Sequence, residues 1–298
     1  FYNMIRLGED LTADDAIRAL YVFNSNPAAT APNQNKVHAG LAREDLFVAV
    51  HELFMSDTAQ RANLVLPACT QAEQWDVHRS YWHDYAQINR PAIAPLGEAR
   101  PNHWVFGRIA QTMGFDEPCF RESEEDTLRG LLAGTELDFD ALAAGPVPCL
   151  PVEKTSFADR RFPTPSGKLE LIAPSYAPAP ADGEHRYRFI TPKSRHLQSS
   201  QMFNVARNQA GVREATLYLH PEDGAREGID DGANVRVWNE RGEVALVARL
   251  SEDVQPGLVA SYMVRWGHNA NATTPDAPAD MGGNSTFHTN FVSLAPAA

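Results

Sequence analysis

The first third of the chain alternates short apolar runs with helical patterns, and this rhythm constrains the fold more than any other feature. Ala19–Phe23, Leu46–Val50 and Asn63–Leu66 are predicted strands, because each is an apolar run ended by turn or polar residues. Helical patterns at Val37–Arg43 and Ser56–Arg61 lie between them. Strands that alternate with helices favour a parallel, doubly wound α/β sheet.

The loops that follow these strands are the first place to look for a site, since ligands of such sheets bind at the carboxyl ends of the strands. Asn24–Pro27, His51–Glu52 and Pro67–Thr70 occupy those ends. His51 and Glu52 begin like the zinc-protease pattern H-E-x-x-H, but Met55 stands where the second His is required. That zinc site is therefore excluded, and taken alone these two residues are most simply part of a solvated loop.

The middle of the chain has a different character. Residues 102–113 form a predicted amphipathic helix that ends at Gly114, because apolar residues recur there at helical spacing. Helical fragments are expected at Glu124–Leu132 and Asp138–Ala143, and the proline-rich stretch Ala173–Ala181 is typical of a linker. We therefore expect a partial α/β domain over residues 1–120 and a connector with a linker over residues 121–184.

From His185 onward the chain reads as β-structure, with a short helix at Pro221–Gly228. Short strands with one small helix favour a compact β-barrel, predicted over residues 185–298. The predicted strands are Tyr187–Thr191, Ala215–Leu219, Asn234–Trp238, Val244–Leu250 and Gly257–Ala260.

Composition excludes several classes of protein. The 26 Lys and Arg against 38 Asp and Glu give a net charge of −12, which disfavours a general nucleic-acid binder. No apolar run reaches the length of about 18 residues that a transmembrane helix needs, and no signal peptide is visible. The 3 cysteines form no metal-binding or disulfide spacing, so each is most simply a small buried hydrophobe. Dinucleotide-fold and hydrolase glycine motifs are missing from the sequence.

Two polar clusters remain as candidate binding segments. Thr191–His196 with Gln198–Ser200 brings cations, hydroxyls and an amide directly after a strand, a combination that binds phosphate oxygens. The tail offers Asn269, Asn271 and Gly282–Asn284, whose amides can pair with a heterocycle and whose glycines permit close approach of the backbone. Each cluster, taken alone, also fits an ordinary solvated loop.

Taken together and in this order, these segments resemble the C-terminal part of the molybdopterin oxidoreductases of the dimethyl sulfoxide reductase family. The resemblance implies an α/β domain remnant followed by a double-psi-like β-barrel that binds a molybdopterin dinucleotide. The segments that carry it are Asn24–Pro27, Pro32–Asn33, His51–Ala59, Ala62–Pro67, Glu73, Pro95–Asn102, Met113–Phe115, Phe162–Glu170, Thr191–Ser200, His220–Asp223, Gly228–Gly232 and Asn271–Val292.

The resemblance also implies a cofactor and its contacts. The family binds molybdenum or tungsten through two molybdopterin guanine dinucleotides, and uses it for oxygen-atom or two-electron transfer to or from a small-molecule substrate. Glu52 suits a ribose or guanine edge, and Asn102 stands where relatives often have Asp. The residues implied to contact a guanine nucleotide are Asn26, His51, Glu52 and Asn102. The residues implied to hold pterin and phosphate are Thr191, Lys193, Ser199, Ser200, Asn271 and His288.

The sequence has no counterpart of the family's iron–sulfur cysteine run or of its metal-ligating residue. We therefore expect a C-terminal portion of a longer catalytic subunit, with any 4Fe-4S cluster and the metal ligand upstream of Phe1. No catalytic residue and no protein metal ligand is predicted here. An electron-transfer subunit is an expected partner, whereas nucleic acid and direct membrane insertion are not, and a cytoplasmic or periplasmic location is left open. One alternative is a non-catalytic cofactor-binding or structural subunit, and another is an unrelated hydrolase using His51 or Glu52.

Overall fold

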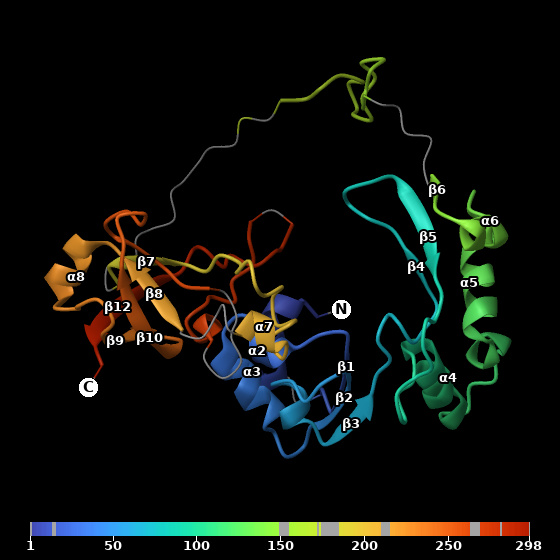
Figure 1. Ribbon diagram of the computed structural model, residues 1–298, viewed down its shortest axis with the longest axis horizontal. Coiled ribbons are helices and arrows are strands. Elements are labelled where there is room, and N and C mark those ends of the chain that lie inside the picture. The colour runs from blue at the N-terminus through green and yellow to red at the C-terminus, as the bar shows by residue number, and fades with distance from the viewer. Residues whose placement is uncertain are drawn as a thin grey trace. The chain divides into compact units, whose positions relative to one another are not determined.

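The computed structural model describes residues 2–13, 16–148, 155–171, 173, 185–209, 215–262, 269–280 and 282–297. Two compact units emerge (Figure 1). One combines residues 1–65 with 178–298, and the other contains residues 66–177. The first unit has two hydrophobic cores, one in the α/β part and one in the barrel, and the second has a core of its own.

The α/β part of the first unit is built on a three-stranded sheet of order β1-β2-β3. β1 pairs in parallel with β2, and Phe23 lies opposite His51. Valines from both strands pack against leucines from α1 and α3, so the apolar runs form the buried face of the sheet. The prediction of a parallel sheet with helices is confirmed, although α1 was not foreseen. The elements are η1 (Met4–Arg6), α1 (Leu7–Ala13), β1 (Ala19–Phe23), α2 (Pro27–Thr30), α3 (Gln34–Leu41), β2 (Phe47–Glu52), η2 (Ala59–Arg61) and β3 (Leu64–Pro67).

The second half of this unit is a closed six-stranded barrel of order β10-β8-β11-β7-β12-β9. Alternate residues of β9 point inward, as Val235 and Val237 do, because strand side chains alternate between faces. The predicted β-barrel is thus confirmed, with β12 as an unforeseen closing strand. Its elements are β7 (Tyr187–Ile190), α7 (Ala206–Gln209), β8 (Thr216–Leu219), α8 (Pro221–Glu227), β9 (Asn234–Asn239), β10 (Gly242–Leu250), β11 (Leu258–Ala260), η4 (Ala270–Ala272) and β12 (Phe291–Pro296).

The second unit contains a small antiparallel sheet of order β4-β5-β6 packed with helices. Ala86 of β5, Leu128 of α5 and Leu142 of α6 share its core. Part of the expected connector is therefore folded, while the predicted boundaries at residues 120 and 184 stay a prediction. Residues 174–184 of the expected linker lie outside the described residues. The elements are β4 (Asp76–His78), β5 (Tyr85–Asn89), α4 (Asn102–Thr112), η3 (Pro118–Arg121), α5 (Glu124–Leu132), α6 (Phe139–Ala144) and β6 (Val147–Pro148).

The cysteines differ in their surroundings. Cys69 is buried, as expected, but Cys119 is exposed, because it lies in the short turn η3 at the surface of the second unit. The expectation that each cysteine is buried was therefore wrong for Cys119, and Cys149 lies outside the described residues.

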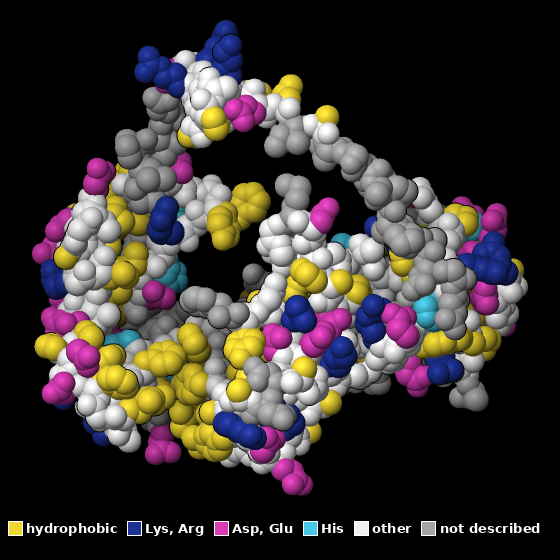
Figure 2. Space-filling model, turned by 180° about the vertical axis from the view of Figure 1, so that it is seen from behind, with side chains coloured by type: hydrophobic (Ala, Val, Ile, Leu, Met, Phe, Trp, Pro, Cys, Tyr) yellow, Lys and Arg dark blue, Asp and Glu magenta, His cyan; other side chains and the backbone are white. Residues whose placement is uncertain are grey.

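Charged side chains of both signs are mixed on the visible surface (Figure 2). On the face seen in Figure 2, Lys and Arg side chains are interspersed with Asp and Glu and form no continuous basic stripe. No helix in the described part of the chain combines the length and hydrophobicity needed to cross a bilayer.

Glu73 fastens the loop that leaves β3. Its Oε2 accepts hydrogen bonds from the backbone N and the hydroxyl of Thr70, both at 2.7 Å, and its Oε1 accepts one from Leu96 N at 2.6 Å. Because these donors favour the charged form, they hold the pKa of Glu73 below its ordinary value. The loop is therefore held by an ionised carboxylate.

This lowered pKa predicts acid-sensitive stability. A depressed carboxyl pKa stabilises the fold above the unfolded-state pKa, and that contribution is lost as the pH falls through the folded-state pKa. The stabilities of the protein and of Glu73→Gln, measured by urea unfolding, should therefore differ most at neutral pH, and the difference should begin to shrink only as the pH falls below the ordinary glutamate pKa of about 4.3. Stability curves that stay parallel down to acid pH would contradict this role for Glu73.

Candidate functional site

Asn26 lies at the carboxyl end of β1, where the chain turns into α2. The turn uses Asn24 at a left-handed φ of 50°, a conformation that Asn tolerates better than most residues. Asn26 is only 6% exposed, and its Oδ1 accepts hydrogen bonds from Thr58 N at 3.1 Å and from Thr58 Oγ1 at 2.7 Å. Its Nδ2 has no hydrogen-bond partner among the described residues. Thr58 therefore orients the Asn26 amide through its oxygen, while the buried nitrogen makes no hydrogen bond to the described residues.

His51 and Glu52 end the neighbouring strand β2. His51 is fully buried, whereas Glu52 is half-buried at the edge. The Glu52 carboxylate accepts a hydrogen bond from Leu53 N at 2.8 Å and another from Ser56 Oγ at 3.3 Å. Because a carboxylate has about four acceptor positions, it can still accept from a ligand.

Thr191 and His288 form a separate group beside β7. Thr191 is 0% exposed, and its backbone N donates to His288 Nδ1 at 3.4 Å. The Thr191 hydroxyl has no hydrogen-bond partner in the part of the chain that the structure describes. Lys193 is exposed on the same loop, and Ser199 follows at a left-handed φ of 54°.

A cavity of about 300 Å³ joins the sheet edge to the barrel loop. Asn26 and Glu52 contribute to it from the α/β part, and Ser200 contributes from the barrel. Three predicted site residues from distant parts of the sequence therefore line one cavity. The remaining lining residues are Leu53, Phe54, Ser56, Gln201, Met202, Asn204 and Val205.

Two other predicted residues lie elsewhere. Asn271 is 0% exposed in η4, and its Nδ2 donates to the carbonyl of Ala29 at 3.0 Å. Its amide nitrogen thus forms a hydrogen bond that connects the barrel tail to α2. Asn102 begins α4 in the second unit.

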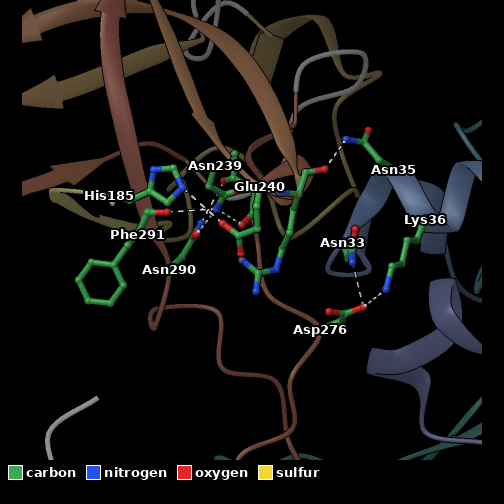
Figure 3. Close-up of polar contacts among 11 residues, drawn as sticks. Asn33, Asn35, Lys36, His185, Asn239, Glu240, Asp276, Asn290 and Phe291 are labelled. Atoms are coloured by element: carbon green, nitrogen blue, oxygen red, sulfur yellow. Dashed lines mark hydrogen bonds and ion pairs between the residues drawn. The ribbon is translucent and has the colours of Figure 1, made fainter. Parts of the chain in front are cut away.

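Asparagines that were not predicted as site residues connect the start of α3 with the barrel (Figure 3). Asn33 N donates to Thr274 O at 2.9 Å, and Asn33 Nδ2 donates to Asp276 Oδ2 at 3.0 Å. Lys36 Nζ lies 3.9 Å from the same carboxylate, and Asn35 Nδ2 donates to Arg241 O at 2.9 Å. The available signal was the Asn-rich sequence on both sides, at 33–35 and 269–271.

A second polar group in Figure 3 lies within the barrel. Asn239 Nδ2 donates to Thr273 O at 2.8 Å and to Asn290 Oδ1 at 3.1 Å. His185 bridges Ser293 Oγ, 2.8 Å from its Nδ1, and Glu240 Oε2, 3.4 Å from its Nε2. These bonds tie the tail loop and β12 to the β9–β10 turn, so they stabilise the barrel beside the interface.

The site as a whole offers hydrogen bonds and a cation rather than metal ligands. No three His, Cys, Asp or Glu side chains gather into a metal-binding group within the described ranges. The cavity combines the Asn26 donor and the Glu52 acceptors with an apolar wall that includes Phe54 and Met202. Such a combination suits a planar heterocycle that carries both donors and acceptors.

Two family models match the chain, one over the α/β part and the beginning of the second unit and the other over the barrel. A model of the molybdopterin oxidoreductases matches residues 6–112, and a model of the molydopterin dinucleotide binding domain matches residues 187–291. The second match coincides with the closed barrel.

Curated relatives match over almost the whole chain. A probable oxidoreductase of Bacillus subtilis, YoaE, is 37% identical over 98% of this chain and 46% of its own length. A putative catalytic polypeptide of a dimethyl sulfoxide reductase from Halobacterium salinarum is 28% identical over 89% of this chain and 35% of its own length. The chain therefore spans less than half the length of these relatives.

A solved structure shares the fold. Acetylene hydratase from Pelobacter acetylenicus superposes with a TM-score of 0.83 at 17% identity, covering 100% of this chain and 47% of that one. At this identity the likeness shows the fold alone. The two family matches and the curated relatives show that the chain belongs to the molybdopterin oxidoreductases of the dimethyl sulfoxide reductase family and corresponds to their C-terminal part.

Proposed function

We propose that this chain forms part of the binding site for a bis(molybdopterin guanine dinucleotide) cofactor in a molybdenum or tungsten oxidoreductase. The observation that carries the proposal is the cavity between the sheet edge and the barrel loop, whose lining includes Asn26, a residue whose buried Nδ2 has no hydrogen-bond partner among the described residues. A buried donor without a partner costs about 1–3 kcal/mol, so its presence in a cavity wall favours a ligand that accepts from it.

The cavity is complementary to guanine. Guanine presents an acceptor at O6 and a donor at its 2-amino group. Asn26 Nδ2 supplies a donor for the first, and the Glu52 carboxylate supplies an acceptor for the second. The 300 Å³ of the cavity is of the size of a small-ligand pocket. These residues fit a guanine nucleotide.

The loop after β7 is proposed to hold pterin and phosphate groups. The Lys193 ammonium supplies a point charge, and the hydroxyls of Thr191 and Ser200 supply donors. Ser199 and His288 complete this group. Asn102, which lies in the second unit, stays a prediction as a guanine contact. His51 and Asn271 are fully buried, so we assign them a supporting role behind the site.

The cofactor, when bound, supplies the redox chemistry of an oxygen-atom or two-electron transfer. The residues of this chain bind it, orient it and separate it from water. The matched formate dehydrogenase polypeptide of Methanocaldococcus jannaschii is named as the alpha chain of its enzyme. By analogy with such a multi-chain enzyme, we propose that the whole protein to which this chain belongs acts on a small-molecule substrate and has an electron-transfer partner.

Replacing Lys193 and Ser200 together with alanine should lower cofactor occupancy of the full-length protein about tenfold while leaving its expression intact. The variant loses one proposed charge-assisted hydrogen bond from Lys193 and one proposed neutral hydrogen bond from Ser200. A combined loss of about 1.4 kcal/mol in binding free energy lowers the affinity for the cofactor tenfold. Molybdenum, tungsten and released guanine nucleotide are measured in the purified protein.

A matched control changes Lys168 and Ser166 to alanine. Both side chains are exposed, and the hydrogen bonds of Ser166 stay within its own turn. This control should keep full occupancy. Unchanged occupancy in the Lys193/Ser200 variant would remove the proposed phosphate contacts. A wild-type protein that binds guanine nucleotide but never contains metal would favour the alternative of a non-catalytic cofactor-binding or structural subunit.

A further inference from the structure

We propose that Asn269 and Asn271 of the barrel tail are positioning residues that fix α2, and through α2 set the preference of the cavity for guanine. This inference rests on the proposed function, since it concerns the same cavity. Neither side chain belongs to the described lining of the cavity. Both act on the backbone of the four-residue helix whose N-cap, Asn26, does line it.

The carbonyl of Ala29 is the point of contact. Asn271 Nδ2 donates to it at 3.0 Å, and Asn269 Nδ2 donates to the same oxygen. The last carbonyls of a helix have no partner within the helix, and α2 is so short that this applies to most of them. Two amides from another part of the chain therefore provide the bonds that the helix cannot make itself.

The two asparagines are themselves held rigidly. Asn269 Oδ1 accepts from Asn271 N at 2.9 Å, and Asn271 Oδ1 accepts from Thr274 Oγ1 at 3.3 Å. Thr274 O in turn accepts from Asn33 N, three residues after the end of α2. The tail loop is thus hydrogen-bonded both to α2 and to Asn33, the N-cap of α3.

The opposite end of α2 is fixed from its own domain. Thr58 Oγ1 accepts from Ala28 N at 3.0 Å and donates to Asn26 Oδ1 at 2.7 Å. Hydrogen bonds from Thr58 on one side and from the barrel tail on the other therefore hold α2 in place. If either set of hydrogen bonds is removed, α2 can shift. Because Asn26 is the N-cap of this short helix, such a shift changes the direction in which the Asn26 amide points.

Base preference is the readout that separates positioning from stability. Guanine presents O6 as an acceptor where adenine presents a 6-amino donor, so a fixed Asn26 Nδ2 donor favours guanine. If the tail substitutions only destabilise the fold, they lower the fraction of folded protein, and the molecules that remain folded keep their preference for guanine over adenine. A displaced amide lowers the preference itself.

The experiment measures binding of GMP and AMP by the full-length protein prepared in cells that cannot make the cofactor. Asn26→Ala should reduce the ratio of the two affinities about tenfold, the effect of losing one buried hydrogen bond. Asn271→Ala, alone and with Asn269→Ala, should reduce it by a similar factor. In the Asn26→Ala background the tail substitutions should have no further effect on the ratio, because they are proposed to act on the base only through the Asn26 amide.

Asn35→Ala is the matched control, since it removes an amide hydrogen bond to Arg241 O at the same interface without touching α2. It should keep the wild-type ratio. If Asn26→Ala loses the guanine preference while both tail variants keep it, the positioning role is wrong and the proposed guanine contact stands. If Asn26→Ala itself keeps the preference, the guanine contact is wrong and the positioning role fails with it.

Discussion

Replacing Asp223 with alanine is expected to lower the free energy of unfolding by about 3 kcal/mol, because it removes a buried carboxylate that satisfies two donors. Asp223 is 0% exposed in the first turn of α8. Its Oδ2 accepts from Gly257 N at 2.7 Å, and its Oδ1 accepts from Arg226 Nη1 at 2.5 Å. The carboxylate thereby ties α8 to the turn that leads into β11.

Loss of this side chain leaves Gly257 N without its acceptor and opens a gap beneath α8. Arg226 can turn toward water because its side chain is 43% exposed, so most of the cost arises at Gly257. Asp223→Asn retains an oxygen for Gly257 N and should lose less stability than Asp223→Ala.

Asp253→Ala is the control for this prediction. Asp253 is exposed in the turn before β11, and a surface substitution of this kind changes stability by about 0.5 kcal/mol or less. Urea unfolding followed by fluorescence measures all three variants. Equal stability of Asp223→Ala and Asp253→Ala would contradict the role of the buried carboxylate.

Strands with a strong local pattern were predictable, and strands that depend on distant partners were not. β1 was predicted at its observed bounds, Ala19–Phe23, because it is a compact apolar run ended by turn residues. β4 and β5 were missed because only Ala86 among their side chains is fully buried, so no clear alternation marks them. β12 pairs with β7 and β9, its closest partner lying more than 50 residues away, and local sequence carries little of that information.

Individual residues of the site could be predicted from the sequence, but the fact that they line one cavity could not. Asn26 and Glu52 follow from the rule that ligands bind at the carboxyl ends of parallel strands. Ser200 follows from the polar cluster after β7. That the three line one cavity depends on how the barrel docks on α2 and α3, through contacts such as Asn33 with Thr274.

Thr58 shows the same limit for a single residue. It lay inside the predicted helical turn Ser56–Arg61 and in the segment His51–Ala59 that carries the family resemblance, but it was not predicted as a site residue. In the structure it is fully buried, and its hydroxyl bonds two groups about 30 residues away in sequence. The parallel pairing of β1 with β2 places the segments that follow both strands at the same edge of the sheet, and these groups lie in those segments.

Thr58→Val should therefore be far more harmful than the similar shapes of the two side chains suggest. We expect a loss of about 2–3 kcal/mol in the free energy of unfolding, because Ala28 N is left without an acceptor in a buried place. Asn26 Oδ1 also loses its 2.7 Å bond and keeps only Thr58 N as a donor. Urea unfolding gives the stability change, and guanine nucleotide content of the full-length protein reports on the Asn26 amide.

The chain offers two comparisons that isolate the hydroxyl. Thr58→Ser retains it and should lose stability only for the missing methyl, with nucleotide content unchanged. Thr12→Val removes a hydroxyl that donates to Gly8 O at 2.8 Å on the exposed side of α1, where water can replace it. If Thr58→Val is no less stable than Thr12→Val and keeps its nucleotide, the hydroxyl does not fix Asn26. If only nucleotide content falls, the hydroxyl orients the amide without supporting the fold, so the two readouts together assign its role.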